Sequence, residues 1–236
     1  MIDVENINAG YGKFHVLFDV NTSIRRDKVT VIVGPNGSGK TTFLKAISGL
    51  ATIYSGRVRF NGQDITHLPT HEIARIGIAY LPQTGNIFLN LNVKENLIMS
   101  SYTLNKGEVK DRVEEVLNYF PILRKYYSRK ANTLSGGERQ MLAIAMALMR
   151  RPKVMLFDEP TANLSPKLAI EVLKEIVNLR DNYKITIAIV EQNARKALEC
   201  GDKALLFVGG RIVYDGEAQE LLKHPELSTL YLGVRH

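Results

Sequence analysis

The residues with the clearest chemical meaning form a glycine-rich stretch between an apolar run, Val29–Val33, and a run with helical spacing, Phe43–Leu50. Glycines let successive backbone N–H groups turn inward around an anion, and the N-terminus of a following helix adds unpaired N–H groups. The stretch consists of Gly34, Pro35, Asn36, Gly37, Ser38, Gly39, Lys40, Thr41 and Thr42. This pattern, G-x-x-x-x-G-K-[ST], predicts a phosphate-binding loop.

Two side chains of this loop have expected roles toward a bound nucleotide. Lys40 should reach the β- and γ-phosphate oxygens, and the Thr41 hydroxyl should coordinate Mg²⁺. A flexible glycine-rich turn is the alternative interpretation. The strand, the glycines, the Lys-Thr pair and the helix occur together, and this combination favours the phosphate site.

An acidic pair follows a second apolar run. Val154–Phe157 predicts a buried strand, and Asp158 and Glu159 come directly after it. Asp158 at the strand end can hold Mg²⁺, directly or through water, while Glu159 should project toward the γ-phosphate. A carboxylate there can accept a proton from the attacking water, a step worth roughly 10²–10⁴-fold in rate. An ordinary strand terminus is the alternative, and the upstream phosphate loop argues against it.

A parallel sheet is needed to position these residues. Continuous apolar runs are typical of strands buried on both faces, and Ile76–Leu81 and Ile185–Val190 are two more of them. The Asn61-Gly62 pair predicts a β-hairpin with a type I′ turn. Two further strands, Leu205–Val208 and Arg211–Tyr214, flank a Gly-Gly turn.

The hydrophobic spacing becomes helical from about residue 86 to residue 151. One amphipathic helix is expected around Val109–Phe120, and a second over about residues 136–149. The α/β pattern then returns, and Ser165-Pro166 supplies an N-cap and first-turn pair for a helix. We therefore predict an α/β core that is interrupted by a helical insertion.

The second predicted helix begins in an unusual way. Ser135 and Glu138 form a capping-box pattern, and Gly136 and Gly137 lie between them. Each glycine costs about 1 kcal/mol of helix propensity relative to alanine, so a close approach to the bare backbone is expected there. A capped helix start with free N–H groups is itself an anion site. A second anion site implies two subunits that share nucleotides.

These motifs together resemble the ABC ATPase family, whose signature is LSGG followed by Gln or Glu, over essentially the whole chain. The resemblance implies a P-loop NTPase (RecA-like) core with an antiparallel β subdomain and an inserted α-helical subdomain. It divides one domain, residues 1–236, into a core with the β subdomain (1–85 and 152–236) and a helical subdomain (86–151) that carries the signature. ATP is the expected nucleotide and Mg²⁺ the expected metal.

The resemblance also implies roles for single residues. Tyr11 is similar to the aromatic residue that stacks on adenine, and Glu159 to the catalytic glutamate. Gln83 is similar to the glutamine that senses the γ-phosphate and joins the metal site. Gln192 occupies the position of the usual switch histidine and can donate a hydrogen bond but carries no positive charge. Ser165 replaces the usual aspartate of the loop that communicates between subunits.

Several partners follow from the same resemblance. Two ATPase subunits, identical or different, pair head to tail, so that the Ser135–Gly137 backbone faces ATP held by the other subunit. Membrane-spanning permease subunits, a solute-binding protein and a place on the cytoplasmic face of the cell membrane are also implied. Short sequence segments at residues 92–97, 190–193, 224–226 and 231–233 are most similar to ATPases of branched-chain amino acid importers. ATPases for other amino acids, urea or lipopolysaccharide are the alternatives.

The composition excludes several classes of protein. The 236 residues carry 31 Lys and Arg against 24 Asp and Glu, a net charge of +7, and 45% are hydrophobic, which excludes a disordered chain. No apolar stretch approaches the roughly 18 residues of a membrane helix, and the N-terminal residues predict no secretory signal. The lone Cys200 fits a reducing compartment.

The net charge alone leaves a nucleic-acid-linked ATPase open. The basic residues are dispersed without interleaved aromatic residues, and the segment between Lys40 and Ser135 has neither sustained heptads nor cysteine pairs. We therefore expect no nucleic-acid partner. An ATPase of cluster assembly is a further alternative.

Overall fold

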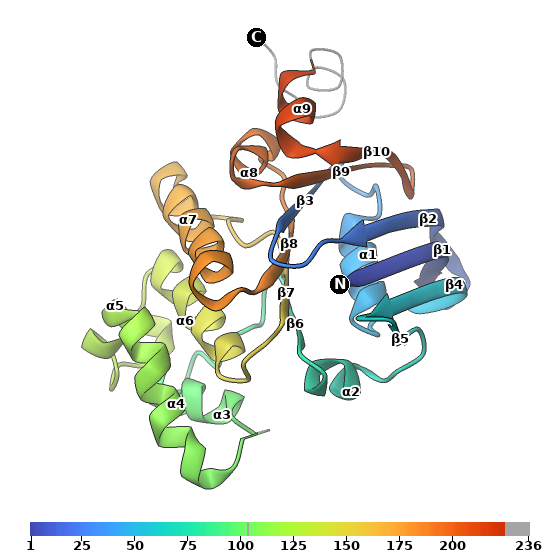
Figure 1. Ribbon diagram of the computed structural model, residues 1–236. Helices are drawn as coiled ribbons and strands as arrows, with labels where there is room; N and C mark the ends of the chain where they lie inside the picture. Colours follow the sequence, from blue (N-terminus) through green and yellow to red (C-terminus); the bar gives the residue numbers. More distant parts are fainter. Residues whose placement is uncertain (103, 225–236) are drawn as a thin grey trace.

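The computed structural model describes residues 1–102 and 104–224, and Figure 1 shows their arrangement. Two sheets form the centre, a four-stranded sheet of order β2-β1-β4-β5 and a six-stranded sheet of order β10-β9-β3-β8-β7-β6. The strands are β1 (Ile2–Tyr11), β2 (Phe14–Ile24), β3 (Val29–Val33), β4 (Thr52–Phe60), β5 (Gln63–Asp64), β6 (Ile78–Leu81), β7 (Val154–Asp158), β8 (Thr186–Val190), β9 (Lys203–Val208) and β10 (Arg211–Glu217).

The helices occur between and after these strands. They are α1 (Lys40–Ile47), α2 (Thr70–Arg75), α3 (Val93–Ser100), α4 (Lys106–Tyr119), α5 (Pro121–Lys125), the 3₁₀ turn η1 (Ala131–Thr133), α6 (Gly136–Leu148), α7 (Pro166–Tyr183), α8 (Ala194–Cys200) and α9 (Ala218–Lys223). No helix within these described residues has the length and apolar composition needed to cross a membrane. The tail phrases Pro225-Glu226 and Tyr231–Gly233 lie outside the described part of the chain.

The six-stranded sheet confirms the predicted parallel core. Its strands β3, β6, β7, β8 and β9 run parallel, and β10 pairs antiparallel with β9 at one edge. Every residue of β3, β7 and β8 is buried, because helices cover one face and α1 with the second sheet covers the other. The strand predicted from Ile76 begins two residues later, since Gly77 turns the chain into it with φ of 109°.

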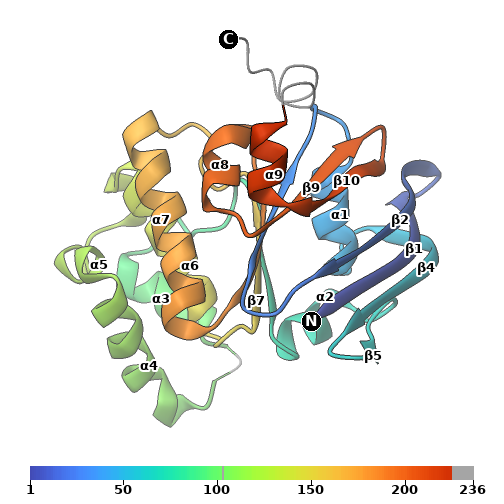
Figure 2. The same ribbon diagram turned by 45° about the horizontal axis from the view of Figure 1, so that its top comes forward.

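The four-stranded sheet is antiparallel and lies on the far side of α1 from the parallel sheet (Figures 1 and 2). The predicted hairpin is present, with φ of 51° at Asn61 and 84° at Gly62 between β4 and β5. Helix α1 packs between the two sheets, and the Phe43 ring lies 5.3 Å from the Phe207 ring of β9. This packing fixes the start of α1 next to the carboxyl ends of the parallel strands.

The helical insertion joins β6 to β7 and covers the other face of the sheet (Figure 2). Helix α6 spans almost the predicted residues and packs against α3 and α7 in one continuous apolar cluster. Arg112 of α4 is buried and donates to the carbonyl groups of Leu148 and Met149, which caps the end of α6. The insertion is therefore tied to the core beside β7.

Candidate nucleotide-binding site

The phosphate loop lies at the carboxyl end of β3, in the middle of the parallel sheet. Gly34 has φ of 146°, and a Cβ atom there would lie 2.1 Å from the Phe207 carbonyl oxygen. Gly37 has φ of 77°, a conformation that side chains with a Cβ rarely adopt. Both positions thus require glycine, for different reasons, and the loop can wrap closely around a ligand.

The donors of this loop fit a phosphate group. Helix α1 starts at Lys40, and its first turn leaves the N–H groups of Lys40, Thr41 and Thr42 ahead of the first helical bond, from Phe43 N–H to the Gly39 carbonyl. The Ser38 hydroxyl is buried and has no hydrogen-bond partner among the described residues. Unpaired donors at a helix N-terminus are the chemistry that binds anions.

A cavity of about 460 Å³ opens over this loop. The structure brings three residues from distant segments to its wall, Gln83, Glu159 and Gln192. The remaining lining comes from Val16 and from the loop residues Asn36, Gly37, Ser38, Gly39, Lys40, Thr41 and Thr42.

Lys40 is buried at the base of the cavity, with 5% of its surface exposed. Its Nζ donates to the carbonyl oxygens of Gly34 and Pro35, both at 2.8 Å. Burial lowers the pKa of Lys40, and the nearby carboxylates of Glu159 and Asp158 oppose this by favouring the ammonium form. The ammonium group therefore lies at the loop with donors to offer to an anion.

Thr41 and Asp158 meet beside Lys40. Thr41 Oγ1 donates to Asp158 Oδ1 at 2.8 Å, and Tyr80 of β6 donates its hydroxyl to Asp158 Oδ2 at 2.9 Å. Burial and the Asp158 charge both raise the pKa of Tyr80, so the phenol keeps its proton and remains a donor. A hydroxyl and a carboxylate are the oxygen ligands that Mg²⁺ prefers, so this pair fits that ion.

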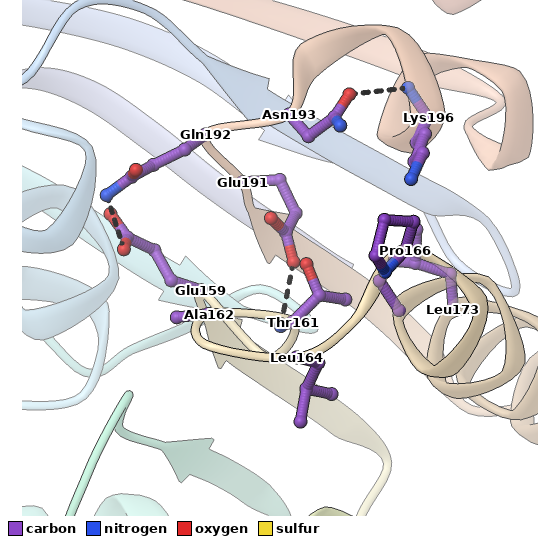
Figure 3. Close-up of a pocket in the computed structure, with 11 residues that line it drawn as sticks. Glu159, Thr161, Ala162, Leu164, Pro166, Leu173, Glu191, Gln192, Asn193 and Lys196 are labelled. Carbon is purple, nitrogen blue, oxygen red and sulfur yellow. Dashed lines mark hydrogen bonds between the residues drawn. The ribbon is translucent and has the colours of Figure 1, made fainter. Parts of the chain in front are cut away.

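Glu159 lies at the end of β7 in a left-handed conformation, with φ of 49°. Its backbone N–H donates to the Val190 carbonyl oxygen at 2.9 Å. Its Oε2 accepts from Gln83 Nε2 at 3.0 Å and from Gln192 Nε2 at 2.8 Å, and Figure 3 shows the Gln192 contact. Two amide donors on one oxygen fix the direction of this carboxylate at the cavity wall.

Tyr11 ends β1 close to the same loop. Its hydroxyl lies 3.4 Å from Thr42 Oγ1, and Lys45 Nζ of α1 lies 5.7 Å from the centre of its ring. The side chain is 42% exposed. One face of an aromatic ring is thus available next to the start of α1.

The signature segment lies apart from the 460 Å³ cavity, and none of its residues lines that cavity. The predicted capping box is present: Ser135 N–H donates to Glu138 Oε2 at 2.7 Å, and Glu138 N–H to Ser135 Oγ at 3.3 Å. A Cβ atom on Gly136 would lie 2.9 Å from Leu164, and one on Gly137 would lie 3.1 Å from Leu168. The close approach expected at these glycines is therefore made, in this chain, by its own leucines.

Two residues next to the site are not predicted by the sequence analysis. Tyr80 falls within an expected apolar strand, and Glu191 falls within a short segment used only for the family resemblance. A signal for Glu191 is present, because a charged residue directly follows the largely apolar run Ile185–Val190. No comparable signal marked Tyr80, since its partner Asp158 comes from a strand 78 residues away along the chain.

Comparison with known proteins agrees with this geometry. Residues 17–162 match the family model described as ABC transporter. The chain is 53% identical to the probable branched-chain amino acid transport ATP-binding protein LivF of Archaeoglobus fulgidus, over 99% of both chains.

Solved structures of ATP-binding cassettes share this fold. The ADP conformation of MJ1267, an ATP-binding cassette of an ABC transporter, superposes with a TM-score of 0.88 at 30% identity over 97% of both chains. A dimeric post-hydrolysis structure of the cassette MJ0796, bound to ADP and Pi, has a TM-score of 0.80 at 26% identity, over 92% of this chain and 99% of that one. The chain therefore belongs to the ABC transporter family, as an ATP-binding domain whose ATPase activity is coupled to transport.

Proposed function

We propose that ATP binds in the 460 Å³ cavity with its phosphates on the loop of residues 34–42 and its adenine against Tyr11. The unpaired donors of the loop, the buried Lys40 ammonium and the exposed Tyr11 ring support this placement. The observation that carries the proposal is that Thr41 and Glu159 both line the cavity, while Asp158, which does not line it, is hydrogen-bonded to Thr41.

Thr41 and Asp158 are the proposed ligands of Mg²⁺, with Gln83 as a further member of the metal site. When bound, Mg²⁺ neutralises charge that develops on the phosphate oxygens. Tyr80 holds the second oxygen of Asp158, so the first oxygen stays directed toward Thr41. The chain's own hydrogen bonds thus orient the two oxygen ligands.

Glu159 is the proposed general base. Its carboxylate accepts the proton of the water that attacks the γ-phosphate, and its direction is set by Gln83 and Gln192. Gln192 occupies the switch position and acts here as a neutral donor to Glu159. Hydrolysis by this arrangement depends on hydrogen bonds from two amides, without a positive charge at the switch position.

A second ATPase subunit is proposed to complete the site in a head-to-tail pair. The Ser135–Gly137 helix start lies outside the chain's own cavity, so the first-turn N–H groups of Gly136 and Gly137 suit ATP that another subunit holds. The dimeric structure of the cassette MJ0796 is consistent with this assembly.

Membrane-spanning permease subunits are the second proposed partner, which gives the chain a peripheral place on the cytoplasmic face of the cell membrane. Two cavities of about 240 and 590 Å³ adjoin between the core and the helical insertion and share Tyr80, Tyr102 and Arg150. We propose two parts of the domain, a core with the β subdomain (residues 1–85 and 152–236) and a helical subdomain (86–151). The walls of these cavities come from residues within 48–85 of the core and from residues of the helical subdomain. A permease segment seated there would touch Tyr80, which is hydrogen-bonded to Asp158.

Branched-chain amino acids are the proposed transported solutes, delivered by a solute-binding protein. The 53% identity to the probable LivF protein over 99% of both chains supports this assignment. Co-purification with the permease subunits, followed by ATP-driven uptake of labelled leucine into vesicles, tests it. Uptake of a different solute class under the same conditions would overturn the assignment.

Nucleotide binding is tested separately on the purified full chain. Lys40→Ala removes a buried ammonium group that donates to the phosphates, so MgATP affinity measured by calorimetry should fall about 10- to 100-fold. Lys174→Ala, an exposed position on α7, is the matched control and should leave the affinity unchanged. Equal affinity of Lys40→Ala and wild type would contradict the phosphate site.

A further inference from the structure

Glu191 is a buried carboxyl group to which the mechanism above gives no role. It directly follows β8 and has only 3% of its surface exposed. Glu191 and Lys196 both line the pocket drawn in Figure 3. Among the described residues, Glu191 nevertheless forms no ion pair within 4.0 Å. Burial raises the pKa of Glu191, which opposes its ionisation. Burying such a group costs free energy unless hydrogen bonds compensate for the lost contact with water.

The carboxyl group reaches across to the loop that follows β7. Glu191 Oε1 accepts a hydrogen bond from the backbone N–H of Thr161 at 3.0 Å, as Figure 3 shows. Its own N–H donates to the Ile32 carbonyl oxygen of β3 at 3.2 Å. Glu191 is thereby anchored to the strand that leads into the phosphate loop while it holds the neighbouring loop.

Two further contacts join the same segments. Glu159 N–H donates to the Val190 carbonyl oxygen at 2.9 Å, and Gln192 Nε2 donates to Glu159 Oε2 at 2.8 Å. Val190, Glu191 and Gln192 thus each form one hydrogen bond to the segment of residues 159–161, and the Glu191–Thr161 bond is the middle one of the three. Loss of the middle contact would leave the direction of the Glu159 carboxylate less restricted.

The same loop packs against the start of α6, the helix that begins in the signature segment. Leu164 N–H donates to the Thr161 carbonyl oxygen at 3.2 Å. The Leu164 side chain lies against Gly136, where an added Cβ atom would come within 2.9 Å of it. The Thr161 peptide therefore connects the catalytic carboxylate on one side with the helix start at Gly136 on the other.

We propose that Glu191 is a positioning residue of the ATPase, whose buried carboxyl group holds the Thr161 peptide and so aligns Glu159 with Gln192 and Leu164 with the signature helix. This inference rests on the proposed function. An apolar side chain at position 191 would leave the Thr161 N–H without its partner, whereas glutamine keeps an acceptor oxygen at the same place.

The test compares Glu191→Ala and Glu191→Gln in the purified full chain, with Glu171→Ala on the exposed face of α7 as matched control. Glu191→Ala should lower kcat roughly 10- to 100-fold while the Kd for MgATP changes by less than about twofold. Glu191→Gln should restore kcat to within about threefold of wild type, and Glu171→Ala should match wild type. Hydrogen exchange of the peptide that contains Thr161 should be about tenfold faster in Glu191→Ala only.

The inference is overturned if Glu191→Ala keeps wild-type kcat and wild-type exchange at Thr161, or if Glu191→Gln loses as much activity as Glu191→Ala. Failure of the proposed function has a different signature, namely absence of MgATP binding by the wild-type chain itself. The exchange measurement then still decides whether Glu191 holds the Thr161 peptide, because it needs no turnover.

Discussion

The side chains of Thr41 and Asp158 are in direct contact, with Thr41 Oγ1 donating to Asp158 Oδ1 at 2.8 Å across 117 residues of sequence. Thr41 lies in the first turn of α1 after β3, and Asp158 is the last residue of β7. Both strands pair in parallel with β8, one on each side, so their carboxyl ends meet at the same edge of the sheet. The parallel core thereby fixes the two oxygen groups proposed to hold Mg²⁺.

Tyr80→Phe should weaken Mg²⁺ binding without loss of the fold. The substitution removes the hydroxyl that donates to Asp158 Oδ2 and keeps the half-buried ring. Loss of such an orienting hydrogen bond typically costs at least about tenfold in metal affinity. The check is a Mn²⁺ titration in the presence of ATP, read by electron paramagnetic resonance.

Tyr54→Phe is the matched control, because its hydroxyl donates only to backbone carbonyl groups of the β1–β2 turn. It should leave the Mn²⁺ affinity at the wild-type value. If Tyr80→Phe also binds Mn²⁺ like wild type, Tyr80 does not orient Asp158 for the metal.

Local patterns in the sequence predicted most of the fold. The runs Val29–Val33 and Ile185–Val190, in which only Thr30 and Thr186 are polar, form buried parallel strands, because strands covered on both faces are apolar at nearly every position. The Asn61-Gly62 turn and the Ser135–Glu138 capping box were also predicted correctly, since their geometry depends on a few adjacent residues.

Contacts between distant segments were beyond sequence reasoning. The Tyr80–Asp158 and Glu191–Thr161 hydrogen bonds depend on which strands are neighbours, and periodicity does not encode that order. The glycines of the signature were correctly associated with a close approach, but the approaching groups in this chain are Leu164 and Leu168. A glycine in the sequence indicates a close approach but does not distinguish a contact within the chain from a contact with an external ligand.

Gly136→Ala should separate nucleotide binding from subunit pairing. The added Cβ atom meets only the flexible end of Leu164, and alanine gains about 1 kcal/mol of helix propensity, so the fold should persist. MgATP affinity of the single chain should stay unchanged, because Gly136 lies outside the 460 Å³ cavity. ATP-dependent dimerisation, measured by analytical ultracentrifugation, should fall at least about tenfold in association constant.

Gly107→Ala in α4 is the control for this measurement, since an added Cβ atom there meets no atom within 4 Å. It should dimerise like wild type. Unchanged dimerisation of Gly136→Ala would argue against a role of the signature helix in the subunit pair.

Glu191→Gln should become more stable than wild type as the pH rises. Burial raises the pKa of Glu191 above its ordinary value of 4.5, and the nearby Glu159 carboxylate acts in the same direction. Above pH 4.5 the unfolded chain loses this proton while the folded chain keeps it, so the free energy of unfolding of wild type falls with rising pH. Glutamine has no such proton.

The difference between Glu191→Gln and wild type should therefore widen as the pH rises above 4.5 in denaturant titrations. Glu171→Gln at an exposed position is the control and should show a constant difference. A difference at Glu191 that stays constant or narrows over this range contradicts the raised pKa.

The central claim is that Glu159 is the general base of ATP hydrolysis, and Glu159→Gln tests it most directly. The substitution keeps the size of the side chain and removes the group that accepts the proton. MgATP affinity should remain within about threefold of wild type, while steady-state hydrolysis should fall about 100-fold or more. Hydrolysis by Glu159→Gln within a few-fold of wild type would contradict the account.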